Sequence, residues 1–146
     1  MDYADIISLL PYKKPFLFVD ELLELNDEGA VGRYHVREDE YFFEGHFPGN
    51  PVVPGVILTE IMAQVGLVSL GLFLTAEEDR GSVRPAFSSA SVDFLSMALP
   101  NDVLEITSKK IYFRFGKLKC SVSCKKSDGT IVAKGELSGM IVKSNQ

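Results

Sequence analysis

One histidine and one glutamate in this sequence are spaced so that they could move protons together. His46 lies in the loop sequence EGHFPGNPVVPG, and Glu60 follows it inside a nearly all-apolar stretch. A histidine titrates near neutral pH, so it can accept a proton there. Burial disfavours the charged form of a carboxyl group, so a glutamate among apolar side chains can donate a proton. The pair suits general acid–base chemistry, in which a proton beside a carbonyl is removed and a leaving group is protonated.

The loop that holds the histidine is expected to be rigid, because prolines fix φ and glycines permit tight turns. These residues are Pro48, Gly49, Pro51, Pro54 and Gly55. Gly55 lacks a Cβ and stands at the start of the expected helix. Its N–H and those just after it can therefore approach a ligand oxygen at the positive end of the helix dipole. This predicts a site that could polarise a carbonyl group.

Residues 56–74 predict one long helix that is buried on almost every side. The only polar residues in this run are Thr59, Glu60, Gln64 and Ser69. Such a helix would be roughly 28 Å long, close to the thickness of a bilayer core. Glu60 and Gln64 are costly in lipid, so we expect a core helix wrapped by a sheet. A structural alternative stays open, in which His46 caps a turn and the two helix residues form a core polar pair.

His46 and Glu60 must be held in place by the elements around them, and the sequence predicts strands both before and after the long helix along the chain. A short amphipathic helix is expected over residues 3–10, ended by Pro11. Hydrophobic patterning and turn residues predict strands at 16–25, 30–36, 86–95, 103–115, 117–126 and 130–142, with the first hairpin turning at 26–29. Two strands, a buried helix and an antiparallel meander give a single α+β domain over residues 1–146, in which the sheet wraps one helix.

Length and composition are consistent with one soluble domain. The chain has 146 residues and is 46% hydrophobic, enough for a sizeable core without disulfides or metals. Its formal net charge of −5 argues against general nucleic-acid affinity. The first residues are acidic and do not form a basic region followed by an apolar one. We therefore expect no secretion signal, no membrane association and a cytoplasmic location.

The cysteines and histidines predict neither a disulfide nor a metal site. Cys120 and Cys124 lie on one face of an expected strand, about 13 Å apart, too far for a disulfide. His35 and His46 are the only histidines, and no zinc-type spacing is present. We expect no metal, no cofactor and two unreactive thiols, and we expect His35 to be a residue on a strand face.

The segment HFPGNPVVPGVILTEIMAQ, residues 46–64, resembles the active-site motif of the β-hydroxyacyl-acyl-carrier-protein dehydratases of type II fatty acid synthesis. The resemblance extends to LPYKKPFLFVD at 10–20 and FFEG at 42–45, and more weakly to PND at 100–102. It implies a hot-dog fold. It also implies a lyase that converts 3-hydroxyacyl thioesters to trans-2-enoyl thioesters in fatty acid biosynthesis or in related lipid or polyene biosynthesis.

The resemblance also implies roles for individual residues. His46 would remove the C2 proton, and Glu60 would help the C3 hydroxyl leave as water. Gly55 would polarise the thioester carbonyl through its N–H, and Gln64 would support the acid. The further predicted substrate contacts and tunnel-lining residues are Phe47, Pro54, Val56, Phe42, Val53 and Phe87.

Partners are implied as well. In the family, the histidine and the carboxylate of one site come from different subunits, so a homodimer is the smallest functional unit and a trimer of dimers is common. The substrate arrives on an acyl carrier protein. Glutamate rather than aspartate at position 60 is similar to the branch that dehydrates without isomerising the double bond.

Two departures from the family pattern concern the carrier protein. The family usually has His and Arg where this chain has Tyr12 and Lys13, and a basic run where it reads VDFLSMAL at 92–99. Charge complementarity helps an acidic carrier dock. We therefore hypothesise a dedicated carrier in a specialised pathway, with the lysines and arginine of residues 109–126 as another candidate docking surface.

Two other functions remain open at this point. A hot-dog acyl thioesterase would release a free thiol, although the complete HFPG motif disfavours this function. A non-catalytic acyl-binding protein or heterodimer subunit would bind acyl thioesters without turnover. The presence of both His46 and Glu60 weighs against that second alternative.

Overall fold

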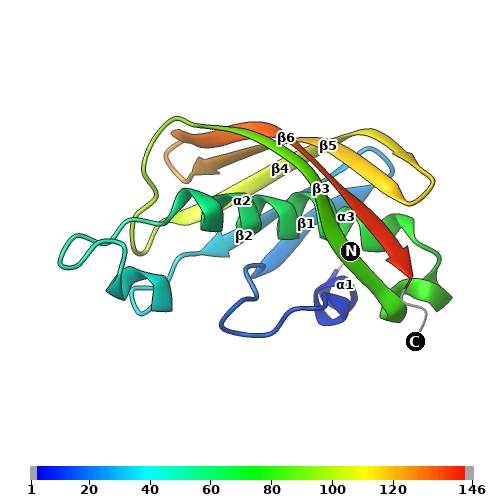
Figure 1. The fold of residues 1–146 in the computed structure, drawn as a ribbon, viewed down its shortest axis with the longest axis horizontal. Helices are drawn as coiled ribbons and strands as arrows, with labels where there is room; N and C mark the ends of the chain where they lie inside the picture. The colour runs from blue at the N-terminus through cyan, green and yellow to red at the C-terminus, as the bar shows by residue number, and fades with distance from the viewer. Residues whose placement is uncertain (1–2, 144–146) are drawn as a thin grey trace.

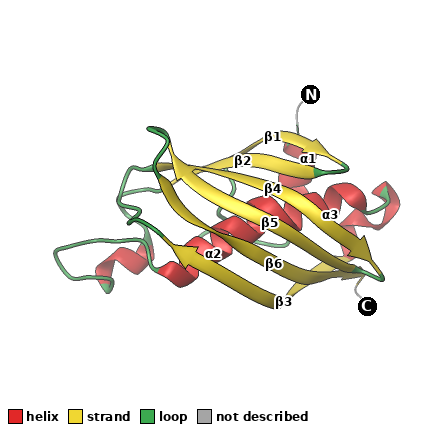
Figure 2. Ribbon diagram, turned by 90° about the horizontal axis from the view of Figure 1, so that it is seen from above, coloured by secondary structure: helices red, strands yellow, loops and turns green. Residues whose placement is uncertain are grey.

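A curved antiparallel sheet wraps one long helix in the computed structural model, which describes residues 3–143 (Figures 1 and 2). The strands are β1 (Glu21–Asn26), β2 (Gly29–His35), β3 (Val83–Phe94), β4 (Val103–Arg114), β5 (Lys117–Lys126) and β6 (Ile131–Lys143). They form one sheet in the order β1-β2-β4-β5-β6-β3, and each neighbouring pair is antiparallel. The predicted α+β hot-dog fold is confirmed.

The helix beneath the sheet changes its winding halfway along. α2 (Gly55–Ala63) passes into a π-helical turn, η2 (Gln64–Val68), and then into α3 (Ser69–Leu74). Gly66 lies in this turn, and a Cβ there would come within 3.1 Å of the side chains of Ser108 and Val122. A Cβ at this position would press on both side chains, so glycine lets the helix lie unusually close to the sheet. The sequence predicted one uninterrupted helix and did not predict the π turn.

The core position of this helix is confirmed by its burial. Residues 61–72 are all buried, and the sheet lies over them (Figure 2). By length and composition alone, Gly55–Leu74 could also cross a membrane. At its C-terminal end, Arg80 of η3 (Glu77–Ser82) donates hydrogen bonds to the carbonyl oxygens of Leu72 at 2.8 Å and Phe73 at 2.9 Å. The guanidinium thus caps the C-terminal end of the helix, where the carbonyl oxygen of Leu72 also accepts from the N–H of Thr75 at 3.2 Å.

The inner face of the sheet follows the alternation expected of strands. In β5, the buried side chains are Leu118, Cys120, Val122 and Cys124. The predicted placement of both cysteines on one face is confirmed, and both are free thiols. Burial raises the pKa of Cys120 and Cys124 to about 12. The thiols therefore stay protonated and unreactive.

One predicted strand begins later than expected. The sequence predicted a strand over 16–25, but β1 starts at Glu21. The reason is Gln64, whose Nε2 donates to the carbonyl oxygen of Phe16 at 2.9 Å and whose Oε1 accepts from the N–H of Phe18 at 2.8 Å. A side chain from the core helix thus takes the place of a neighbouring strand and overrides the local β propensity.

The remaining predicted elements are confirmed, with small shifts at their ends. The N-terminal helix is α1 (Ala4–Leu9). In the first hairpin turn, Asn26 Oδ1 accepts from the N–H groups of Glu28 at 2.8 Å and Gly29 at 3.2 Å. The segment between β2 and α2, which includes the loop that carries His46, also contains a short 3-10 helix that was not predicted, η1 (Tyr41–Glu44).

β3 forms one edge of the sheet and is exposed along almost its whole length. Val83 is its only buried residue, and Phe87 and Phe94 are each 50% exposed. Within the described residues this strand pairs only with β6, so its other edge carries unpaired backbone groups. Such an edge is available to pair with another strand.

Candidate active site

His46 lies between η1 and α2, and its imidazole is held in one tautomer. Nδ1 is 2.9 Å from the carbonyl oxygen of Val52. Because a carbonyl oxygen can only accept, Nδ1 carries the proton in the neutral imidazole, and Nε2 then keeps its lone pair. The N–H of His46 donates to the carbonyl oxygen of Phe42 at 3.1 Å, and the ring of Phe47 stacks on the imidazole with centroids 4.0 Å apart. Nε2 is therefore available as a base.

The loop that carries His46 projects from the end of the sheet where α2 begins (Figure 1, cyan). The loop is joined to the connection between β3 and β4 through a hydrogen bond from the N–H of Val53 to the carbonyl oxygen of Ala98, 2.9 Å long. The carbonyl oxygen of Pro54 then accepts the first helical bonds. The N–H groups of Gly55 and Val56 precede these bonds, so they stand at the positive end of the helix. Val56 is 78% exposed.

Glu60 is a half-buried acid supported by a fully buried amide. Its Oε2 accepts a hydrogen bond of 2.9 Å from Nε2 of Gln64. Burial raises the pKa of Glu60 above the ordinary value of 4.5, although the hydrogen bond from Gln64 opposes this shift. The shift is towards the protonated form, which is the direction that the sequence predicted. Gln64 also binds Phe16 and Phe18, so both ends of its amide are occupied.

Glu60 lines an apolar cavity of about 200 Å³. The other lining residues are Tyr12, Phe16, Ala63, Leu67, Val68, Pro85, Ala86, Phe87, Gly139 and Ile141. Burial, with Glu60 nearby, raises the pKa of Tyr12, so its hydroxyl stays protonated. An apolar pocket with one acid at its wall suits an acyl chain whose reacting carbons lie beside Glu60. Within residues 3–143, no three His, Cys, Asp or Glu side chains cluster so as to hold a metal ion.

The single chain does not bring the two predicted catalytic residues into one cavity. Of the predicted site and lining residues, only Glu60 and Phe87 line the cavity. Those outside it are His46, Gly55, Gln64, Phe47, Pro54, Val56, Phe42 and Val53. Sequence reasoning also missed most of the lining. Ala63 and Leu67 follow Glu60 at helical spacing and could have been found, whereas the residues from β3 and β6 join only through the fold.

The raised pKa of Glu60 predicts a pH-dependent contribution to stability. The folded chain binds this proton more tightly than the unfolded chain does. The resulting stabilisation is complete below about pH 4.5 and is lost as the pH rises through the raised value. We expect the free energy of unfolding of the native chain, relative to Glu60→Gln, to fall with rising pH in that window. Urea unfolding of both proteins at several pH values across this window measures the difference in their free energies of unfolding. A difference that does not change with pH would contradict the raised pKa of Glu60.

The chain matches known proteins over nearly its whole length. Residues 10–136 match a FabA-like domain. The chain is 40% identical over 140 residues to the 3-hydroxyacyl-(acyl-carrier-protein) dehydratase FabZ of Caldicellulosiruptor saccharolyticus, across 93% of this chain and 95% of that protein. It is 35% identical over 144 residues to the protein of the same name from Acetivibrio thermocellus, across 98% of this chain and 96% of that protein.

Solved structures share the fold at much lower identity. The dehydratase heterocomplex ApeI:P from Xenorhabdus doucetiae superposes with a TM-score of 0.79 at 15% identity, covering 95% of this chain and 91% of that chain. A hypothetical thioesterase from Streptococcus pneumoniae, solved with coenzyme A, superposes with a TM-score of 0.62 at 14% identity. The match covers 86% of this chain and 88% of that chain. At these identities the likeness shows the fold alone.

Proposed function

The chain belongs to the FabA-like family, and from this membership we propose that it dehydrates 3-hydroxyacyl thioesters of an acyl carrier protein to trans-2-enoyl thioesters in fatty acid biosynthesis. One observation of the site carries the proposal: the chain holds a base and an acid in complementary states. His46 keeps Nε2 free, while burial favours the protonated form of Glu60 at the wall of an apolar cavity.

The proposed reaction uses each group once. Nε2 of His46 takes the C2 proton, and the electron pair of that C–H bond forms the C2–C3 double bond. The C3–O bond breaks as Glu60 gives its proton to the hydroxyl, which leaves as water. The N–H of Gly55 stabilises negative charge on the thioester oxygen at the start of α2. Solvent then returns the proton to Glu60 and removes the one on His46.

Turnover of a 3-hydroxyacyl group on a carrier protein tests the function directly. We expect loss of one water molecule by mass and a trans-2-enoyl product, without the cis-3 isomer, for at least one chain length. Release of a free thiol would instead indicate a thioesterase. Binding without turnover at every chain length would indicate a non-catalytic or heterodimeric subunit.

We propose that the active unit is a homodimer in which each site takes His46 from one subunit and Glu60 from the other. The free edge of β3, with Phe87 and Phe94 half exposed, supports a second copy at this edge. Phe47, on the loop that carries His46, is also exposed and adds apolar surface. The absence of His46 from the lining of the Glu60 cavity also supports a shared site. Assembly into a trimer of dimers stays a prediction.

Complementation between two inactive variants tests the shared site. In a dimer of His46→Ala with Glu60→Gln, one of the two shared sites keeps both native residues. Random reassembly should therefore restore about one quarter of the native turnover. Each variant reassembled with itself is the control. If both residues of a site came from one chain, the mixture would stay as inactive as the controls.

We propose that the chain uses a dedicated carrier protein in a specialised pathway. The segment after β3 presents an apolar surface, with Leu95 53% and Met97 65% exposed, and Asp93 is exposed beside it. Such a surface offers little attraction to a strongly acidic carrier. We expect faster turnover with a pathway carrier than with a housekeeping carrier, and equal rates would count against this proposal. A cytoplasmic location also stays a prediction.

A further inference from the structure

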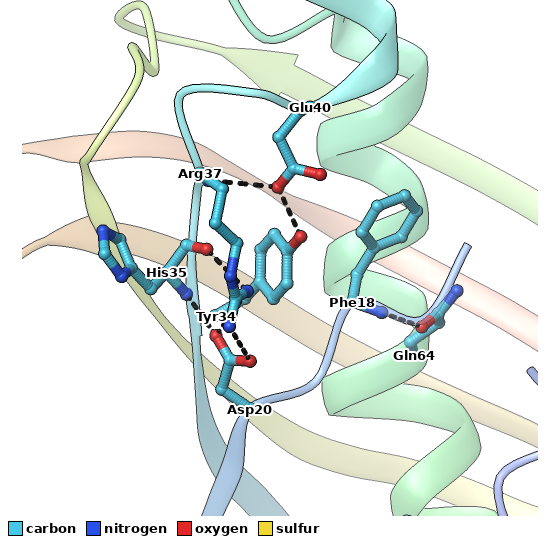
Figure 3. A network of polar contacts seen from close by, with 7 residues as sticks. All are labelled: Phe18, Asp20, Tyr34, His35, Arg37, Glu40 and Gln64. Carbon is cyan, nitrogen blue, oxygen red and sulfur yellow. Dashed lines mark hydrogen bonds and ion pairs between the residues drawn. The ribbon is translucent and has the colours of Figure 1, made fainter. Parts of the chain in front are cut away.

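The segment of residues 16–20 is bonded to the helix that carries Glu60. The carbonyl oxygen of Phe16 and the N–H of Phe18 bind the two ends of the Gln64 amide, at 2.9 and 2.8 Å. The same amide donates to Glu60 at 2.9 Å. Figure 3 shows the bond between Phe18 and Gln64. These three hydrogen bonds, of which the one to Phe18 is buried, therefore join the position of this segment to that of the acid.

The same segment is bonded, at Asp20, to the start of the loop that carries His46. Arg37 lies two residues after the end of β2, and its guanidinium makes two bonds to Asp20, of 2.8 and 3.0 Å. Asp20 also accepts from the N–H of His35 at 2.7 Å, and Arg37 donates to the carbonyl oxygen of His35 at 2.9 Å (Figure 3). Paired N–H bonds fix orientation as well as distance.

Glu40 closes the next turn of the loop. Its carboxylate accepts from the Tyr34 hydroxyl and, at 3.2 Å, from the N–H of Arg37 (Figure 3). Tyr34 is buried, and its ring packs edge-on against Phe18 with centroids 5.4 Å apart. The guanidinium of Arg37 lies over the Tyr34 ring, 5.2 Å from its centroid. Glu40 and Asp20 therefore anchor the same short stretch from two sides.

A few contacts through η1 connect Glu40 to His46. The carbonyl oxygen of Glu40 accepts from the N–H of Phe43 at 3.1 Å, which begins η1. The ring of Phe42 packs against Phe18, with centroids 6.4 Å apart. The carbonyl oxygen of Phe42 accepts from the N–H of His46 at 3.1 Å. Within one chain, the loop that carries His46 and the segment that holds Glu60 are thus connected through Phe18 and its neighbours, although the two residues serve different sites in the proposed dimer.

We propose that Asp20 and Glu40 are positioning residues, whose carboxylates fix the His46 loop to the segment that holds Glu60 and so set the direction of Nε2. This inference rests on the proposed function. The side chains of Arg37 and Asp20 are 39% and 33% exposed, so their ion pair contributes little to stability. The ion pair instead fixes the position of the loop. Position matters to the reaction because a misplacement of about 1 Å can lower a rate by up to about a hundredfold.

The test uses Asp20→Asn, which removes the charge from the ion pair, and Tyr34→Phe, which removes one bond to Glu40 and keeps the buried ring. We expect each variant to lower kcat about tenfold with KM nearly unchanged, and Asp20→Glu to recover part of the loss. The matched control is Glu21→Gln, which breaks the neighbouring ion pair, 3.2 Å long, between Glu21 of β1 and Arg33 of β2. The control should keep the native kcat.

Imidazole ¹⁵N spectra provide a readout that does not depend on activity. The chain has only two histidines, so the signals of His46 can be assigned with His46→Ala. We expect native His46 to show one tautomer, protonated at Nδ1, and Asp20→Asn and Tyr34→Phe to show a tautomer mixture. The proposal is overturned if these variants keep both the native spectrum and the kcat of Glu21→Gln. An inactive native chain would refute the proposed function, while the spectra would still report on the positioning.

Discussion

Replacement of His46 by alanine is expected to lower kcat for dehydration about a thousandfold, the usual contribution of a positioned general base. Nε2 is the atom left free by the hydrogen bond between Nδ1 and Val52, and alanine offers no group that can take the C2 proton. Substrate contacts elsewhere are unchanged, so KM should change little. The measurement is steady-state turnover of a carrier-bound 3-hydroxyacyl thioester.

The matched control for this prediction is His35→Ala. His35 is the other histidine of the chain and lies exposed at the end of β2. Its substitution removes an imidazole of the same kind without touching the His46 loop side chains, and the native rate should persist. Retention of more than about a tenth of the native kcat in His46→Ala would rule out its role as the general base.

Replacement of Glu60 by glutamine is expected to lower kcat by a similar factor, about a thousandfold, because an amide cannot protonate the departing hydroxyl. Glutamine has nearly the same shape, and its carbonyl oxygen can still accept the bond that Gln64 now donates to Glu60. The fold and substrate binding should therefore be preserved. A loss of rate without a loss of stability identifies the missing proton as the cause.

A changed leaving group separates the two catalytic roles. A 3-fluoroacyl thioester loses fluoride, which needs a proton from the enzyme less than hydroxide does. Glu60→Gln should recover part of its lost rate with this substrate, and His46→Ala should not, because the C2 proton must still be removed. Equal losses for both variants with both substrates would contradict the assignment of separate roles. Glu78→Gln, an exposed acid beyond the far end of the core helix, is the control.

Much of the fold follows from local features of the sequence. The apolar run over residues 56–74 predicted a helix buried on almost every side, and the polar residues Glu60 and Gln64 within it favoured a protein core over a membrane. The strands after the helix alternate in polarity and are separated by turn residues. Both features can be recognised from residues that are close together in the sequence. The side chains at positions 46 and 60 were identifiable because their chemistry depends on residue type and on the motif around them.

Only the tertiary structure decided how these parts are connected. Phe16 and Phe18 have strand-like side chains, but Gln64, far along the chain, takes their backbone hydrogen bonds and delays the start of β1. The π turn arises where Gly66 meets the sheet. The cavity beside Glu60 draws its wall from α2, η2, β3 and β6. The hydrogen bonds of Asp20 with His35 and Arg37 join the segment before β1 to the end of β2 and the loop after it, and no sequence periodicity relates these segments. Each of these features depends on packing between distant residues, and local propensity contains no information about such contacts.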